Sequence, residues 1–280
     1  MTVAKYFNIP DRKLTDGDLG VEVEVEGCNL PRRIPRYWNT DYDGSLKGEA
    51  YEYVLAKPLK KPELAKALVE LDKAYLTNGS VVNDSVRCGV HVHVNVQKLT
   101  ITQLYNFFTL YSLFEGPLLH YCGKGRDGNL FCLPLNKSPQ VVYALREAAQ
   151  QKEFRPLYDD AYRYCAMNVK ALGQYGSLEF RALRGGPDLQ RVYKWAELLQ
   201  HLRDVAMEFK DPCEIIESAS LNGHLETFKK LLGDKRSVMF KAVPNIKRKL
   251  QKGARNAAAI AFATNWADFD KKYDPYPDFY

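Results

Sequence analysis

The stretch Gly89-Val90-His91-Val92-His93-Val94-Asn95-Val96 alternates valines with polar side chains, two of which can bind a metal ion. Successive side chains of a β-strand point to opposite faces of the sheet, so His91, His93 and Asn95 share one face. The valines on the other face predict that the strand packs against a hydrophobic core. Imidazoles are common metal ligands, although two structural histidines with satisfied hydrogen bonds would give the same pattern.

Two further segments carry charged side chains on one face of an expected strand. Residues 20–26 read Gly-Val-Glu-Val-Glu-Val-Glu, and residues 177–183 read Ser-Leu-Glu-Phe-Arg-Ala-Leu. At a rise of about 3.3 Å per residue, neighbouring carboxylates on one face lie about 7 Å apart. They repel each other by about 2 kcal/mol at an effective dielectric constant of about 20, and a bound divalent cation would reverse that sign. The three segments together predict one site.

Several carboxylates, two imidazoles and an arginine favour a particular chemistry. Oxygen-rich ligand sets suit Mg²⁺ or Mn²⁺, whereas zinc sites more often combine histidine with cysteine. Metal ions that bridge phosphate oxygens, together with an arginine, are suited to the transfer of a phosphoryl group. The chain has no G-x-x-x-x-G-K-[ST] motif, which excludes a P-loop nucleotidase at the level of motif.

The loop 123–128 reads Gly-Lys-Gly-Arg-Asp-Gly and formally matches the G-x-G-x-x-G pattern. A helix is expected before this loop, where a dinucleotide-binding fold needs a strand, so the match does not indicate that fold. Two interpretations stay open: Lys124 and Arg126 reach a phosphate, or the segment is an ordinary turn.

The composition is typical of a globular protein, with 280 residues, 46% of them hydrophobic, and a formal net charge of +6. This length predicts one large domain with an appendage, or two domains. The six cysteines are scattered and form no C-x-x-C pair, which predicts reduced thiols. Residues 1–18 lack the apolar core of a secretory signal and no apolar run is long enough to span a membrane, so we expect a cytoplasmic protein.

The order of the expected elements indicates an α+β fold with a largely antiparallel sheet. A fourth strand is expected at 50–55, where Glu52 lies between two tyrosines. Four helices are expected. One spans residues 62–76, one begins after Thr100 as its cap, one spans 139–151, and one runs from Pro187 to Lys210. A turn is expected at 173–176, directly before the strand that carries Glu179.

After Asp211 the expected strands stop and short helices follow. Between Lys229 and Arg255 about ten basic residues stand against Asp234 alone. This stretch either holds a polyanion such as a nucleic acid or forms a solvated helical face. We therefore divide the chain into a catalytic domain at 1–212 and a helical, basic C-terminal extension at 213–280 that ends in an aromatic tail.

The order of these motifs resembles the amidoligase branch of the glutamine synthetase and glutamate-cysteine ligase superfamily, a group of carboxylate-amine ligases. The resemblance spans residues 20 to about 195. The segments that carry it are Gly20-Val21-Glu22-Val23-Glu24, Trp38 with Asp43-Gly44-Ser45-Leu46, Tyr51-Glu52-Tyr53-Val54 before Pro58, Cys88-Gly89-Val90-His91-Val92-His93-Val94, Asn168, and Ser177-Leu178-Glu179-Phe180-Arg181.

The resemblance implies a curved, largely antiparallel sheet of the glutamine synthetase catalytic-domain type, with helices packed on it. It also implies a reaction in which ATP phosphorylates a carboxylate before an amine displaces phosphate, so that an amide or isopeptide bond forms. The implied cofactors are ATP and Mg²⁺ or Mn²⁺. The implied substrates are a small-molecule or peptide carboxylate and an amine, and neither nucleic acid nor a membrane is expected as a partner.

The resemblance also implies roles for individual residues. The implied metal ligands are Glu22, Glu24, Glu52, His91 and Glu179. The implied catalytic residues are Glu24, Glu52 and Arg181, of which Arg181 binds phosphate. Contacts to the nucleotide or the substrate are implied for His93, Asn168 and, from the loop, Arg126.

Some questions stay open at the level of sequence. Ser177 and Leu178 stand where the family usually has Thr-Ile, and the stretch after Asp211 matches no family motif. The two substrates, the group that deprotonates the amine and the oligomeric state are therefore undetermined. The His-x-His pattern with acids is also compatible with a metal-dependent amide or ester hydrolase, and the basic stretch with a non-catalytic polyanion-binding protein.

Overall fold

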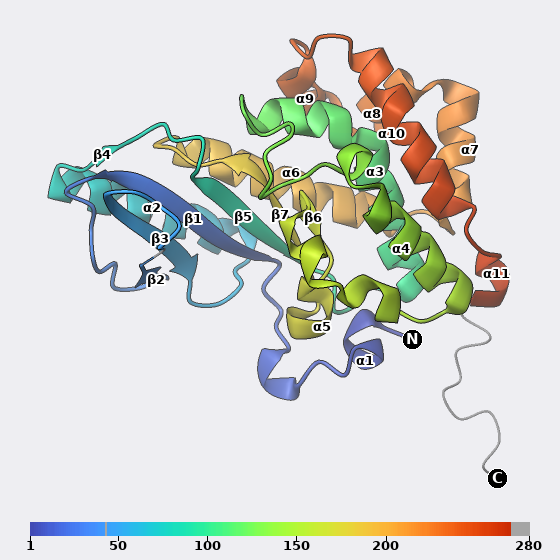
Figure 1. The fold of residues 1–280 in the computed structure, drawn as a ribbon, viewed down its shortest axis with the longest axis horizontal. Helices are drawn as coiled ribbons and strands as arrows, with labels where there is room; N and C mark the ends of the chain where they lie inside the picture. The colour runs from blue at the N-terminus through green and yellow to red at the C-terminus, as the bar shows by residue number, and fades with distance from the viewer. Residues whose placement is uncertain (43, 270–280) are drawn as a thin grey trace.

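Figure 1 shows a computed structural model of the chain, which describes residues 1–42 and 44–269. Seven strands within these residues form one antiparallel sheet in the order β2-β3-β1-β5-β7-β6, and β4 pairs with the end of β1. The strands are β1 Leu19–Cys28, β2 Trp38–Asp41, β3 Glu49–Leu55, β4 Val81–Val82, β5 Gly89–Asn95, β6 Met167–Asn168 and β7 Ser177–Arg184. The four predicted strands are confirmed as β1, β3, β5 and β7, and so is the α+β class with an antiparallel sheet. Asp43, in one of the segments that carry the resemblance, and the aromatic tail lie outside the described residues.

Helices make up most of the remaining structure. They are α1 Val3–Tyr6, α2 Lys61–Asn78, α3 Ile101–Cys122, α4 Pro139–Gln151, α5 Ala171–Tyr175, α6 Leu189–Ala206, α7 Pro212–Asn222, α8 His224–Leu232, α9 Asp234–Ser237, α10 Ile246–Ala261 and α11 Trp266–Phe269. The predicted cap of α3 is confirmed, because Thr100 and Gln103 form a reciprocal capping box with hydrogen bonds of 3.1 and 3.0 Å.

The helix predicted from Pro187 to Lys210 is α6, which is shorter at both ends and finishes at Ala206, and the turn predicted at 173–176 is wrong. α6 begins at Leu189 rather than at Pro187, because the Asp188 carboxylate caps the helix by accepting a hydrogen bond from the Arg191 amide at 3.0 Å. Most of the turn predicted at 173–176 is the helix α5, and only Gly176 leaves the helical conformation, with φ of 65°.

One face of the sheet is apolar and is covered by α2, α3 and α6 (Figure 1). The valines at 21, 23 and 25 of β1 and those at 90, 92 and 94 of β5 are at most 1% exposed. On the helix side, Phe107, Phe108 and Phe114 of α3 are fully buried, so the aromatic side chains of this helix pack in the core. Burial of this face leaves the opposite, polar face of the same strands for the site.

The helices after residue 212 pack on the same core. α10 runs against α3, and Leu250 and Ala257 of α10 belong to the main cluster of buried side chains. Gly253 makes this close approach possible, because a Cβ at this position would lie 2.4 Å from the Leu113 carbonyl oxygen and 2.6 Å from that of Ser112. The division into two domains at residue 212 stays a prediction.

Gly253→Ala is expected to lower the free energy of unfolding by about 1–3 kcal/mol, because the added methyl group overpacks the contact between α10 and α3. Urea unfolding measures the change. Helix propensity alone predicts the opposite sign, since alanine is favoured over glycine by about 1 kcal/mol within a helix. A stabilised Gly253→Ala variant would therefore contradict the close packing.

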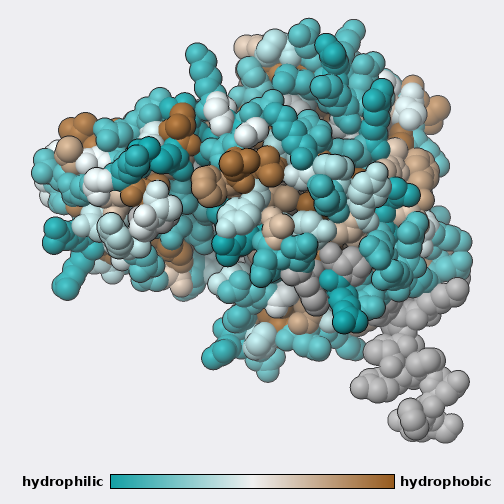
Figure 2. All heavy atoms as spheres, in the orientation of Figure 1, coloured by the Kyte–Doolittle hydropathy of each residue, from teal (hydrophilic) through white to brown (hydrophobic). Residues whose placement is uncertain are grey.

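Hydrophilic side chains cover most of the face shown in Figure 2, with small apolar patches between them. Every helix among residues 1–42 and 44–269 is too short or too polar to cross a membrane. All six cysteines lie in the described residues and all are free, which confirms the predicted thiols; Cys88, Cys122, Cys132 and Cys165 are buried.

Candidate active site

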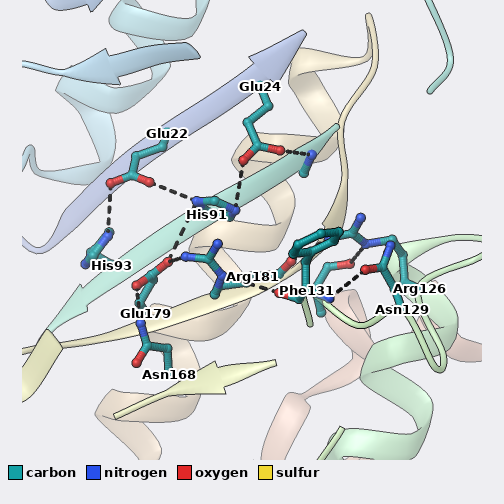
Figure 3. A network of polar contacts seen from close by, with 12 residues as sticks. Glu22, Glu24, His91, His93, Arg126, Asn129, Phe131, Asn168, Glu179 and Arg181 are labelled. Carbon is teal, nitrogen blue, oxygen red and sulfur yellow. Dashed lines mark hydrogen bonds and ion pairs between the residues drawn. The ribbon is translucent and has the colours of Figure 1, made fainter. Parts of the chain in front are cut away.

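The polar face of the sheet brings three acids together around His91 (Figure 3). His91 on β5 stands opposite Glu22 on β1, and its Nδ1 lies 2.8 Å from Glu22 Oε2. The same nitrogen lies 3.7 Å from Glu179 Oε1 on β7, and Nε2 lies 3.4 Å from Glu24 Oε1. His91, Glu24 and Glu179 are buried. Acids from two strands that flank β5 on either side thus meet at one imidazole.

Both carboxylate oxygens of Glu179 are held by neighbouring side chains. Arg181, two residues along β7, forms an ion pair with Oε1, and the Asn168 side-chain amide donates a hydrogen bond to Oε2 at 2.6 Å. Asn168 itself accepts a hydrogen bond from the Lys170 amide at 2.9 Å. The Arg181 side chain remains 21% exposed, so it can contact a ligand. Asn168 orients Glu179, and Arg181 places a positive charge beside it.

His93 lies on the same polar face and contacts Glu22 from the other side. Its Nε2 lies 3.3 Å from Glu22 Oε1, and its Nδ1 lies 3.2 Å from Ser177 Oγ. The Glu22 carboxylate therefore bridges the imidazoles of His91 and His93, as Figure 3 shows.

All five predicted metal ligands come together on this face. Two overlapping groups have ligand atoms within 4.8 Å of one another: Glu22 with Glu52 and His91, and Glu22 with His93 and Glu179. Glu24 contacts His91, and its strand position is opposite Glu52 on β3. Carboxylate oxygens with one or two imidazole nitrogens are a donor set that fits Mg²⁺ or Mn²⁺.

Glu26 shares the face of Glu22 and Glu24 but takes no part in this cluster. Arg87 binds both of its oxygens, at 3.0 and 3.1 Å, and the Lys47 amide donates to it at 2.9 Å. The bond to Arg87 lowers the pKa of Glu26 to about 2 despite burial. Its charge is therefore already neutralised.

The cluster around His91 has an excess of negative charge. Burial raises the pKa of Glu22, but hydrogen bonds to His91 and His93 outweigh burial and hold this pKa well below its usual range. For His91, burial lowers the pKa, and the hydrogen bond to Glu22 together with the charges of Glu24 and Glu179 raises it overall, even though Arg181 opposes them. The Glu22 carboxylate thus stays ionised and favours a positive charge beside it.

Arg126 occupies a structural position beside the site. The pairing of β5 with β7 shifts register between Val90 and Val92, which gives β7 an extra residue. Arg126 is 3% exposed, and it donates to the carbonyl oxygens of Arg181 at 2.7 Å and of Ala182 at 2.9 Å, within this bulge. It therefore holds the part of β7 that carries the Arg181 side chain. Its predicted contact with a nucleotide stays a prediction.

Arg126→Gln is expected to lower the free energy of unfolding by about 3 kcal/mol, because three main-chain carbonyls lose a charged donor. Urea unfolding tests this value. Lys124→Gln is the matched control, since it removes the same charge from an exposed position of the same loop and is expected to cost less than about 0.5 kcal/mol. Equal losses in both variants would contradict the assigned role.

A hollow of about 580 Å³, which we call the His93 hollow, opens beside the cluster. Glu22 and His93 line one end of it, and the Tyr175 ring meets the His93 imidazole edge-on at 5.9 Å between centroids. Arg12 and Lys57 also line it, are exposed, and form no ion pair with any residue in 1–42 or 44–269. The hollow thus connects the acidic cluster to two unpaired cations.

Sequence patterns missed several groups that hold the site. The Gly89 amide donates to Glu24 Oε2 at 2.6 Å, and the Phe131 carbonyl accepts from Arg181 Nε at 3.4 Å. Main-chain groups carry no residue-type signal, so no pattern could have found these two. Ser177 lies two residues before Glu179, so the alternation of faces is the signal that could have found it.

Comparison with known proteins identifies a family for the chain. The model of the family described as "Putative amidoligase enzyme" matches residues 58–203, which make up just over half of the chain. The matched region contains β5 and β7, whereas β1 and β3 precede it. No curated protein matches the chain. The extent of the family match shows that the chain belongs to this family of amidoligase enzymes.

Proposed function

We propose that the protein is an ATP- and Mg²⁺-dependent carboxylate-amine ligase that forms an amide or isopeptide bond through an acyl phosphate. The observation that carries this proposal is the meeting of Glu22, Glu24 and Glu179 at His91, with Arg181 paired to Glu179. Membership of the amidoligase family supports a ligase with small-molecule or peptide substrates. ATP, the metal ion and a sheet of the glutamine synthetase type are part of the proposal.

In the proposed reaction a carboxylate oxygen of the substrate attacks the γ-phosphorus of ATP, the bond to ADP breaks, and an acyl phosphate forms. The amine then attacks the acyl carbon, the carbon–oxygen bond to phosphate breaks, and inorganic phosphate leaves. The amine nitrogen loses a proton in this step, and a carboxylate of the polar face is suited to accept it. The products are an amide, ADP and phosphate.

The residues of the cluster contribute mainly by position and charge. Bound Mg²⁺ supplies charge neutralisation for the phosphate oxygens. Arg181, held beside Glu179 and partly exposed, is suited to stabilise the charge on the phosphoryl group in transfer. His91 and Asn168 keep the acids in fixed positions, so that the site needs little rearrangement during reaction. The catalytic roles of Glu24 on β1 and of Glu52 on β3 stay predictions.

The His93 hollow is suited to the carboxylate substrate, because it leads from Glu22 to two cations. Arg12→Gln combined with Lys57→Gln is expected to raise KM for that substrate about tenfold while KM for ATP stays unchanged. Lys230→Gln with Lys235→Gln is the control, since it removes two exposed charges from α8 and α9. If both double variants raise KM equally, the hollow does not select the substrate.

The test of the proposal is phosphate release by the purified protein with ATP, Mg²⁺, and a panel of amino acids, short peptides and polyamines. The expected result is release that needs a carboxylate and an amine together and that is lost in Glu22→Ala. Equal release by wild type and Glu22→Ala across the panel would sink the proposal. Turnover of an amide or ester without ATP, unaffected by Arg181→Ala, would instead identify a hydrolase.

A further inference from the structure

Two sequence features outside the candidate active site meet at one hollow. The loop 123–128 and the basic helix α10 line it together with the end of α3, and its volume is about 290 Å³. We call it the basic hollow. Its ionisable and amide side chains are His120, Lys124, Asp127, Asn136, Lys249 and Lys252.

The basic hollow carries uncompensated positive charge. Asp127 is the only acid among its described lining residues, and it is already paired with Lys137 at 2.9 Å. Lys124, Lys249 and Lys252 form no ion pair with any residue in the part of the chain that the structure describes. An anion in the hollow would have lysines on two sides, from the loop and from α10.

The start of α10 adds to the same imbalance. Its first turn contains Lys247, Arg248 and Lys249 but no acid, and Asn245 makes no side-chain capping bond. The N-terminal end of a helix is partly positive, so cations there are unfavourable, and Lys249 and Lys252 are neighbours on one helix face. By contrast, His120 is the basic residue in the last turn of α3, at the end of the helix where the dipole favours a positive charge. An anion would offset the unfavourable charge on α10.

The loop also offers main-chain donors. Gly123 and Gly125 have φ of 108° and 79°, which lets the chain turn sharply. The amides of Lys124, Gly125 and Asp127 donate no hydrogen bond to any other described residue. Free amides in such a turn are suited to donate hydrogen bonds to phosphate oxygens.

The geometry points to a binding site for a phosphate-bearing anion in the basic hollow, distinct from the candidate active site. Binding there stabilises the loop 123–128, and the loop holds β7 at two points. Arg126 donates to the carbonyls of Arg181 and Ala182, and Arg184 donates to the Lys124 carbonyl at 3.3 Å. Occupation of the hollow therefore stabilises the segment of β7 that carries the Arg181 side chain.

The test is thermal unfolding of the full chain with pyrophosphate or ADP, against sodium chloride at equal ionic strength. EDTA is present throughout, so that divalent ions are absent and the acids of the active site repel both probes. Pyrophosphate is expected to raise the unfolding temperature of wild type and of Arg181→Gln by several degrees. A shift with both probes identifies a site for the diphosphate group itself, and a shift with pyrophosphate alone identifies a site for free phosphate compounds.

Matched variants separate the hollow from general charge. Lys249→Gln with Lys252→Gln is expected to bind pyrophosphate at least tenfold more weakly, whereas Lys247→Gln with Arg248→Gln, on the same helix, keeps wild-type affinity. Lys124→Gln gives the same loss without changing the helix, should the first variant fail to fold. Equal losses in both helix variants, no shift in wild type, or a shift with ADP alone would overturn the proposal.

Hydrogen exchange tests the connection to β7. Pyrophosphate is expected to slow exchange in residues 123–129 and in the Arg181 region of β7 of the wild type, and to leave exchange unchanged in Lys249→Gln with Lys252→Gln. Binding without slower exchange at β7 would overturn the coupling between the hollow and the strand.

Discussion

Glu179→Gln is expected to lower ATP-dependent phosphate release by about a thousandfold, or about 4 kcal/mol in activation free energy. Glutamine keeps the size of the side chain and an oxygen for the Asn168 amide. It loses the charge that pairs with Arg181 and that belongs to the predicted metal cluster. Phosphate release at saturating ATP measures the effect, with thermal unfolding as a check that the variant is folded.

Glu26→Gln is the matched control for this prediction. Glu26 lies on the same face of β1 as the cluster acids, but both of its oxygens bind Arg87. The variant is therefore expected to unfold at a lower temperature while phosphate release stays within about threefold of wild type. A loss as large as that of Glu179→Gln would mean that any acid on this face matters equally, which contradicts the assigned site.

The stability of the protein is expected to fall between about pH 5 and pH 8 because of a single buried acid. Glu115 lies on α3 at 2% exposure, and its Oε1 accepts a hydrogen bond from the Leu135 amide at 2.8 Å. Burial raises its pKa to about 8, although hydrogen bonds from the amides of Leu135 and Asn136 oppose that rise. In this range the folded protein keeps a proton on Glu115 that the unfolded chain releases, so rising pH favours unfolding.

Glu115→Gln isolates this contribution, because glutamine resembles the protonated acid and still accepts the Leu135 amide. At pH 5 the variant is expected to match wild type within about 1 kcal/mol, and near pH 8 to exceed it by about 3–5 kcal/mol in unfolding free energy. Urea unfolding at pH 5, 6.5 and 8 measures the difference. Parallel pH profiles of the two proteins would contradict a neutral Glu115 in the folded state.

Much of the sheet could be predicted from the sequence because alternation has a period of two residues. Alternating valines in β1 and β5 put one face in the core, and the acids and imidazoles then had to share the other face. Strands that belong to one sheet share its polar face, so the acids and imidazoles on these strands are expected to lie close together. For this reason the clustering of Glu22, Glu24, His91 and Glu179 on one face could be predicted.

The details of the site depend on contacts that alternation does not specify. The bulge in β7 and the burial of Arg126 against its carbonyls arise from strand register, which a one-strand pattern cannot determine. The ion pair of Glu26 could not be predicted from alternation either, because its partner Arg87 lies in a loop. The boundary of α6 shows a smaller effect, since Asp188 competes with Pro187 as the start signal and its carboxylate caps the helix.

We expect the acids around His91 to form a site for a divalent metal ion. Electron paramagnetic resonance of Mn²⁺ tests it directly, because the signal of free aqueous Mn²⁺ is lost when the ion binds. The predicted result is that wild type and Glu26→Gln bind Mn²⁺ beyond the amount that ATP alone binds, that Mg²⁺ displaces it, and that Glu22→Gln combined with Glu179→Gln removes this additional binding. Equal Mn²⁺ binding by that double variant and wild type, or no binding by wild type, would contradict a metal site at these acids.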